Sequence, residues 1–245
     1  MSKRKRKVAA LINRIQFIDL ASAVVLPASS RKDWLRRYVE RAMKGGDFAT
    51  YKPLRNAYPT IYGVQRGLDV SPKVEWGELE RSLVQACKGK DEEMNVSAAK
   101  VLFDLVRAKD YLAYDHTPQD LSLGLNRKAA IGISIYLVEG EEVVFQFPYP
   151  RRNRLDAAVN NLMMSLIYHS YARGDFAGAA VEIADLSCAT STYIKGKDGT
   201  RRPPPRDPRI VRLEQDNLIQ LDDLTPHVQN VHELLIEIGT EPDPT

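Results

Sequence analysis

The chain is poor in cysteine and histidine. Its 245 residues include two cysteines and four histidines, and Cys87 and Cys188 lie far apart without CxxC or Cys–His spacing. This pattern excludes a disulfide framework and argues against a zinc site or a redox pair. A chain of this length with 44% apolar residues can bury a sufficient core without cross-links. We therefore expect a globular cytoplasmic protein with reduced thiols.

Long apolar runs are absent as well. The segment that follows the basic start Lys3–Lys7 reads VAALINRIQFIDL, and Asn13, Arg14, Gln16 and Asp19 interrupt it. No segment reaches the roughly 18–20 apolar residues needed to span a bilayer, so we expect a soluble protein without a membrane span. A first core helix fits this segment better than a basic amphipathic helix lying on an anionic membrane, which is the alternative.

Motifs for common catalytic chemistry are missing. The chain contains no GxGxxG, GxxxxGK[ST], GxSxG or HExxH pattern, which removes the usual markers of nucleotide hydrolysis, dinucleotide redox chemistry, triad hydrolysis and zincin proteolysis. His169 falls on an apolar helical face, while His227 and His232 are five residues apart and do not share a helical face. We predict a non-catalytic protein that needs no cofactor and no metal.

Charge is distributed unevenly along the chain. Residues 1–66 contain 15 Lys and Arg against 4 Asp and Glu, whereas the remainder contains 20 against 28. From Glu214 onward there are eight acidic residues and no Lys or Arg. The two ends of the chain are therefore expected either to attract each other or to seek partners of opposite charge.

A basic helix is predicted over residues 28–45. Ser30 and Asp33 resemble a capping box, apolar residues recur at helical spacing, and Gly45 with Gly46 supplies the end. The opposite face is almost purely cationic, whereas a helix built only for solubility usually mixes both signs. Its members are Arg31, Lys32, Arg36, Arg37, Arg41 and Lys44.

The rest of the first 115 residues is also predicted to be mainly helical. Tyr51, Tyr58 and Tyr62 lie among cationic residues and prolines, a pattern that fits either packing within a loop or stacking on nucleic-acid bases. Two further helices follow, one ending at Gly89 and one over about residues 96–113.

Residues 126–240 predict a two-layer α+β domain. Alternating apolar residues indicate a hairpin over about 131–147, followed by a helix over 154–173 and a strand near 180–185. One or two short strands and a last helix complete the order strand, strand, helix, strand, strand, helix. We predict an antiparallel sheet covered on one face by two helices, with a long Pro-, Gly- and Lys/Arg-rich loop over 187–209.

The stretch FPYPRRNRLD joins the hairpin to the next helix. Asn153 is predicted to be the N-cap of that helix, with Asp156 in its first turn. Arg151, Arg152 and Arg154 would then lie at the positive end of the helix dipole, where backbone amides and guanidinium groups hold a phosphate or carboxylate. The alternative is that these arginines point into water or pair with Glu141 and Glu142.

An enzymatic alternative follows from the element order, which resembles the core of restriction-type nucleases. That resemblance implies Mg²⁺ held by carboxylates on adjacent strands, here Glu142, Asp156, Glu182 and Asp185. The sequence departs from the pattern because Gln146 stands where a basic residue is expected. The carboxylates therefore also fit a solvated strand face.

The favoured function is that of an accessory protein that binds nucleic acid or another polyanion through its basic N-terminal part. The alternative is an interaction or scaffold subunit whose basic helix docks an acidic protein surface or a second copy of the chain. Pairing of Arg36, Arg37 and Arg41 with carboxylates of the same chain would favour the alternative. The predicted anion contacts are Lys3, Arg4, Lys5, Arg6, Lys7, Arg31, Arg36, Arg37, Arg41, Lys44, Arg151, Arg152, Arg154, Arg201 and Arg202.

Overall fold

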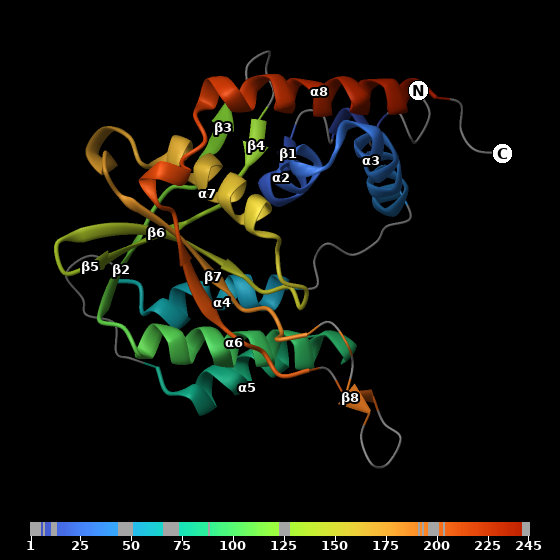
Figure 1. Cartoon of the computed structure of the whole chain (residues 1–245). Coiled ribbons are helices and arrows are strands. Elements are labelled where there is room, and N and C mark those ends of the chain that lie inside the picture. The colour runs from blue at the N-terminus through green and yellow to red at the C-terminus, as the bar shows by residue number, and fades with distance from the viewer. Residues whose placement is uncertain are drawn as a thin grey trace.

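Helices cover both faces of a five-stranded sheet in the computed structural model of the chain (Figure 1). The structure describes residues 6, 8–10, 14–43, 51–65, 74–87, 89–122, 128–190, 192, 194–195, 201–202 and 204–241. Five of the predicted anion contacts therefore lie outside the described residues: Lys3, Arg4, Lys5, Lys7 and Lys44.

The central sheet has the strand order β10-β7-β6-β5-β2. All neighbouring strands are antiparallel except β6 and β7. Parallel neighbours require a crossover connection, which helix α7 (Ala157–Tyr171) supplies between β6 and β7. The strands are β2 (Tyr111–Asp115), β5 (Ile135–Glu139), β6 (Glu142–Tyr149), β7 (Ala180–Asp185) and β10 (Arg209–Arg212).

Two small sheets flank this centre. β1 (Arg14–Gln16) pairs in parallel with β4 (Lys128–Ala130), which also pairs with β3 (Asp120–Ser122). β8 (Ile194–Lys195) and β9 (Arg201–Arg202) form a two-stranded sheet within the long loop. The β1–β4 pair ties the N-terminal part of the chain directly to its middle.

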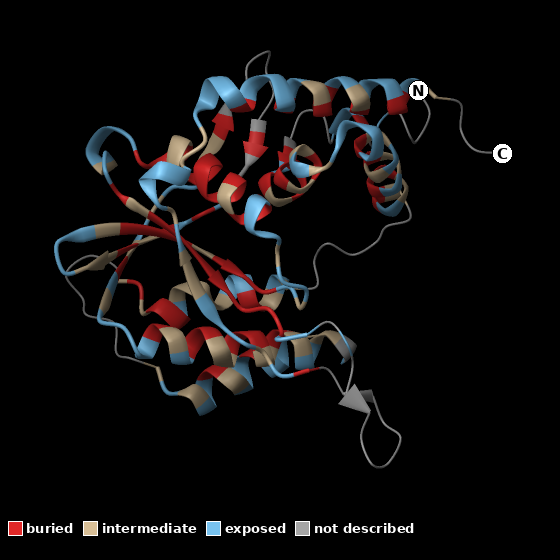
Figure 2. Cartoon of the chain, viewed as in Figure 1, coloured by how far each residue is buried: buried red, intermediate tan, exposed pale blue. Residues whose placement is uncertain are grey.

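The helices form one layer on each face of the sheet. The first layer contains α2 (Phe17–Val25), α3 (Ala28–Met43), α7 and α8 (Leu221–Thr240). The second contains α4 (Lys52–Tyr62), α5 (Trp76–Ala86) and α6 (Glu92–Arg107), and short 3₁₀ turns lie at Gly89–Asp91, Gly174–Phe176 and Gln215–Asn217. Each layer encloses its own hydrophobic cluster against the sheet, and Figure 2 shows buried residues concentrated on the strands and the helix faces turned toward them.

The α+β class predicted from the sequence is confirmed, with a mostly antiparallel sheet. The predicted helix over 154–173 and the predicted last helix lie on the same side of the sheet. The N-terminal helices do not form a layer of their own, because α2 and α3 join α7 and α8 while α4–α6 cover the other face. The boundaries at about 115 and 126 stay a prediction.

Two local predictions were wrong. The helix expected to continue to about residue 113 ends at Arg107, and Tyr111–Asp115 is an edge strand of the central sheet. The strand expected from Ile131 begins only at Ile135, because Gly132 has φ +69° and turns the chain. Isolated helical or alternating periodicity does not show where a chain turns into or out of a sheet.

The side chain of Arg31 joins three helices of the first layer. It is buried, and its guanidinium donates to the carbonyl oxygens of Ala23 (3.0 Å), Val24 (2.8 Å) and Leu26 (3.0 Å) at the end of α2, and to Asn230 Oδ1 of α8 (2.6 Å). The last carbonyl groups of a helix lack partners within the helix, so Arg31 satisfies the C-terminus of α2. Its role is structural, which corrects the prediction that it contacts phosphates.

We predict that Arg31→Ala lowers the free energy of unfolding by about 3 kcal/mol, because several buried carbonyl groups lose their donor at once. Arg37→Ala, on the exposed side of the same helix, serves as the matched control and should change it by less than about 0.5 kcal/mol. Urea denaturation of both variants, followed by circular dichroism, makes the comparison. Equal effects of the two substitutions would show that the contacts of Arg31 contribute nothing specific.

Candidate protein interaction site

The basic face of α3 is partly neutralised by the acidic end of α8. Lys32 forms an ion pair with Glu237 and lies 3.6 Å from Glu241. The guanidinium of Arg36 contacts Glu241 at 2.8 Å and Asp33 at 2.7 Å. The opposite charges of the two chain regions thus meet within one molecule, and the surface offered to a polyanion is reduced.

The remaining predicted arginines of α3 lie away from α8. Arg37 and Arg41 line a shallow hollow with Trp34 and Glu40. Neither forms an ion pair with another residue that the structure describes. Among the described residues, the basic face of α3 thus retains two arginines without an ion-pair partner, where the sequence predicted a continuous cationic face.

The arginines of the turn after β6 do not gather around one point. Arg154 pairs with Asp207 (2.7 Å) and lies 3.6 Å from Asp185, while Arg151 Nη2 lies 3.8 Å from Asp19 Oδ1. Asp156, not Asn153, is the N-cap of α7, since its carboxylate accepts from Ala158 N at 2.8 Å. The helix starts three residues later than predicted and carries its own anion at its positive end.

The other predicted contacts are also dispersed. Arg6 is exposed near the start of the described chain, and the backbone carbonyl of Arg152 accepts from Cys188 N at 2.8 Å. Arg201 and Arg202 form β9 in the long loop. The predicted residues whose side chains the structure describes therefore do not form one continuous patch.

The carboxylates of the nuclease alternative have other partners. Glu142 pairs with Arg212, Asp156 caps α7, and Asp185 accepts from Arg209 Nε at 3.0 Å. Glu182 is buried and accepts from Gln146 Nε2 at 2.9 Å. Among the residues that the structure describes, no group of three or more His, Cys, Asp or Glu side chains could hold a metal ion.

The main concave site lies where the central sheet splits. The β5–β6 ladder ends at the pair Leu137–Val144, although the same register continued by two residues would place Ile135 opposite Gln146. The chain before Ile135 instead follows β2, where His116 N donates to Ser134 O at 2.7 Å. β6 therefore continues to Tyr149 without a described strand on that side. A cleft of about 380 Å³ opens between the separated strands.

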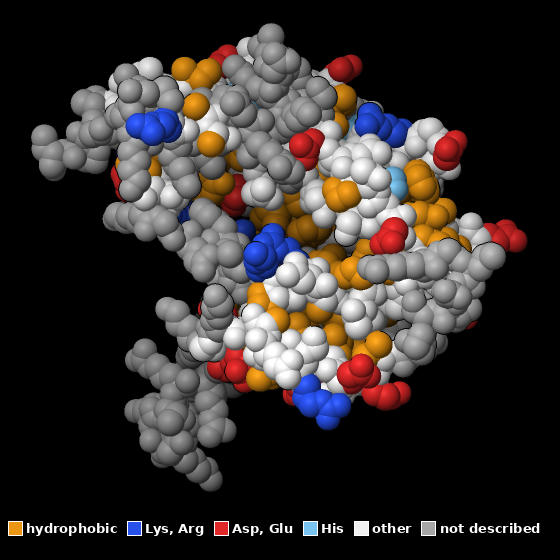
Figure 3. Space-filling view, turned by 180° about the vertical axis from the view of Figure 1, so that it is seen from behind, with side chains coloured by type: hydrophobic (Ala, Val, Ile, Leu, Met, Phe, Trp, Pro, Cys, Tyr) orange, Lys and Arg blue, Asp and Glu red, His pale blue; other side chains and the backbone are white. Residues whose placement is uncertain are grey.

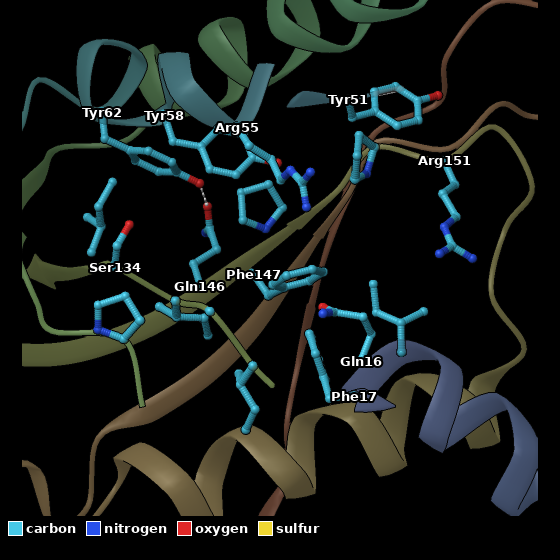
Figure 4. Close-up of a pocket in the computed structure, with 18 of the residues that line it drawn as sticks. Gln16, Phe17, Tyr51, Arg55, Tyr58, Tyr62, Ser134, Gln146, Phe147 and Arg151 are labelled. Carbon is cyan, nitrogen blue, oxygen red and sulfur yellow. Dashed lines mark hydrogen bonds between the residues drawn. The ribbon is translucent and has the colours of Figure 1, made fainter. Parts of the chain in front are cut away.

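The walls of this cleft are mainly apolar and aromatic. α4 contributes Tyr58 and Tyr62 from one side, and the start of α2 contributes Phe17, which packs edge-to-face on Phe147 with ring centroids 4.8 Å apart. Figure 4 shows these side chains facing one another across the cleft, and Figure 3 shows hydrophobic side chains exposed in a hollow between the two halves of the molecule. A concave apolar site with few polar groups is typical of ligand and peptide binding.

A buried polar chain fixes one wall of the cleft. Tyr62 Oη donates to Gln146 Oε1 at 2.6 Å, and Gln146 Nε2 donates to Glu182. Burial raises the pKa of Tyr62 well above its ordinary value, so its hydroxyl keeps the proton that this hydrogen bond needs. Because both ends of the Gln146 amide are bound, its orientation is set before any ligand arrives.

The mouth of the cleft is cationic. Arg55 from α4 and Arg151 from the turn after β6 are exposed there, beside Tyr51 (Figure 4). Among the described residues that line the cleft there is no Asp or Glu. From the sequence, Arg151 and the tyrosines of α4 were singled out, but as contacts for nucleic acid. The open strand edge was missed, although a proline and a glutamine inside an apolar strand, Pro148 and Gln146, are its sequence signals.

The comparisons with known proteins decide the family. Residues 18–242 match the family described as the sliding clamp-binding bacterial toxin SocB. The chain belongs to the SocB family. The DNA replication inhibitor toxin SocB of Caulobacter vibrioides (strain NA1000 / CB15N) is similar to it, with 23% identity over 234 residues that cover 92% of this chain and 90% of the relative. No solved structure matches.

Membership of the SocB family contradicts the prediction of a nucleic-acid-binding accessory protein. The family is described by a protein partner, the sliding clamp, and the basic helix expected to hold nucleic acid docks against the chain's own α8. The interaction-subunit alternative agrees better with both findings. Among the described residues of this SocB-family chain, no helix is long and apolar enough to cross a bilayer.

Asp19 gives this SocB-family chain a pH-dependent stability. Burial raises the pKa of Asp19 above its ordinary value of 3.8, and it outweighs the opposing effects of Arg151 and of the hydrogen bond from Tyr38. The folded chain then binds this proton more tightly than the unfolded chain does. The contribution of Asp19 to stability is therefore lost as pH rises from about 4 through the folded pKa.

We predict that Asp19→Asn, which does not titrate, gains stability relative to the native chain over that interval. The difference in the free energy of unfolding should grow by up to about 1.4 kcal/mol per pH unit and then level off. Urea denaturation of both proteins between pH 4 and pH 7.5 measures it. A difference that does not change with pH would mean that Arg151 keeps the pKa of Asp19 at its ordinary value.

Proposed function

We propose that this chain binds a sliding clamp and inhibits DNA replication through that contact. The observation that carries the proposal is the match to the SocB family over residues 18–242, which runs from the second residue of α2 to beyond the end of α8. Almost the whole folded unit is therefore shared with the family, and not only a local motif. The C. vibrioides relative, named as a replication inhibitor toxin, supports the same function over 90% of its own length.

The structure supports protein recognition as the mode of action. The ion pairs between α3 and α8 reduce the cationic surface that sequence-independent DNA binding would use. The four carboxylates of the nuclease alternative bind arginines, a backbone N–H group or a buried amide. We expect inhibition to follow from occupation of the clamp by this chain. Its place of action would be the cytoplasm, where the clamp encircles DNA.

The proposal predicts clamp-dependent inhibition of DNA synthesis. In a reconstituted reaction with clamp, clamp loader and polymerase, the chain should shorten the products, and additional clamp should restore full-length synthesis. Synthesis by the polymerase without a clamp is the matched control and should be unaffected. Co-elution of the chain with the purified clamp in size-exclusion chromatography measures the contact directly.

Two results would contradict the proposal. Inhibition of equal size in the reaction without a clamp would place the target elsewhere. Inhibition that is relieved by additional template DNA, and not by additional clamp, would indicate binding to the nucleic acid.

A further inference from the structure

We propose that the cleft between β5 and β6 is a second recognition site, which takes an extended acidic peptide segment of a partner protein as an added strand along the open edge of β6. The proposal does not depend on clamp binding. It follows from the backbone at the split in the sheet, from the apolar walls, and from the charge at the mouth.

The open edge of β6 supplies backbone groups for strand pairing. Leu186 N donates to Tyr149 O at 2.9 Å, so the backbone groups of Tyr149 face β7. Successive residues of a strand direct these groups to opposite sides, which turns those of Gln146 and Pro148 toward the cleft. Within the described strands, Gln146 and Pro148 are paired only with Glu182 and Ala184 of β7.

β5, on the other side of the cleft, also extends beyond its last pair with β6. Leu137 is paired with Val144 of β6, and Ile135, two residues earlier on the same side of β5, has no partner in β6. A peptide lying between the two strands would find an N–H and a C=O on Gln146 and a C=O on Pro148, which lacks an N–H. Strand addition of this type obtains affinity from main-chain hydrogen bonds and specificity from side-chain pockets.

The residues at the walls and the mouth of the cleft predict which side chains the bound peptide segment carries. Phe17 and Phe147 on one side, and Tyr58 and Tyr62 on the other, favour apolar side chains inside the cleft. At the mouth, the guanidinium of Arg55 forms no ion pair or hydrogen bond with any other residue that the structure describes, although the backbone N–H of Arg55 donates to Tyr51 O at 3.0 Å. Among the described residues, the one ion-pair partner of Arg151 is Asp19, at 3.8 Å. Exposed guanidinium groups favour a carboxylate on the ligand when, as among the described lining residues here, no Asp or Glu lies beside them in the cleft.

The test uses the intact chain and fluorescein-labelled hexapeptides blocked at both termini. Each peptide contains Val, Leu, Ile and Phe in a different order, with Asp or Glu at both ends; the matched set carries Asn or Gln at those ends. Fluorescence anisotropy should show at least one acidic peptide binding about tenfold more tightly than its amide counterpart. N-methylation of that peptide at the residue opposite Gln146 should abolish binding, because it removes the main-chain N–H that donates to the strand.

Substitutions in the chain locate the site. Arg55→Ala and Arg151→Ala should each weaken binding of the acidic peptide about tenfold. Ser134→Trp, which places a large side chain in the cleft, should abolish it. Arg81→Ala, an exposed arginine on α5, is the matched control and should leave binding unchanged. Thermal unfolding of each variant verifies that it is folded.

Several results would overturn the proposal. It fails if no acidic peptide binds, if Arg81→Ala weakens binding as much as Arg55→Ala, or if N-methylation has no effect at any position. A concentration-dependent dimer that Ser134→Trp abolishes would identify a second copy as the occupant. A small organic molecule retained in native mass spectrometry, without peptide binding, would assign the cleft to a different ligand. None of these results bears on clamp-dependent inhibition, which is measured separately.

Discussion

The buried guanidinium of Arg31 joins α2, α3 and α8, three of the four helices in the first helical layer of this protein. A helix that ends inside a core leaves carbonyl groups without partners, and Arg31 donates to three of them at the end of α2 while it also contacts α8. This contact packs the start of α3 against both α2 and α8. It also places Lys32 and Arg36 against the acidic end of α8. The need to satisfy the carbonyl groups at the end of α2 thus brings part of the cationic face of α3 into contact with α8.

A second constraint is the early end of the β5–β6 ladder. A sheet that closed completely would pair Gln146 with Ile135 and leave no cleft between β5 and β6. Gly132 turns the preceding chain away, and the buried chain of Tyr62, Gln146 and Glu182 keeps the resulting wall rigid. An open strand edge inside an otherwise paired sheet invites pairing with another chain. A protein whose family acts on a protein partner has a use for such an edge.

Much of the fold could be predicted from local sequence signals. The basic helix starting at residue 28, the hairpin around Gly140 and the helix after FPYPRRNRLD were all found, because apolar periodicity and turn residues report local structure. Strand β2 was missed because Tyr111–Asp115 becomes a strand only through pairing with β5. The N-cap was assigned to Asn153 instead of Asp156, since both residue types cap helices and only the position of the first turn separates them.

By itself, the sequence determined the class of fold, the absence of familiar catalytic motifs, and the opposite charges of the two ends of the chain. It did not determine which charged residues form ion pairs. Arg36 on α3 pairs with Glu241, 205 residues away, only after α3 and α8 have packed together. The same holds for the cleft, whose lining comes from α2, α4, β5 and β6. Pairing over such distances depends on the cost of closing long loops and on burial across the whole molecule, which only the tertiary structure resolves.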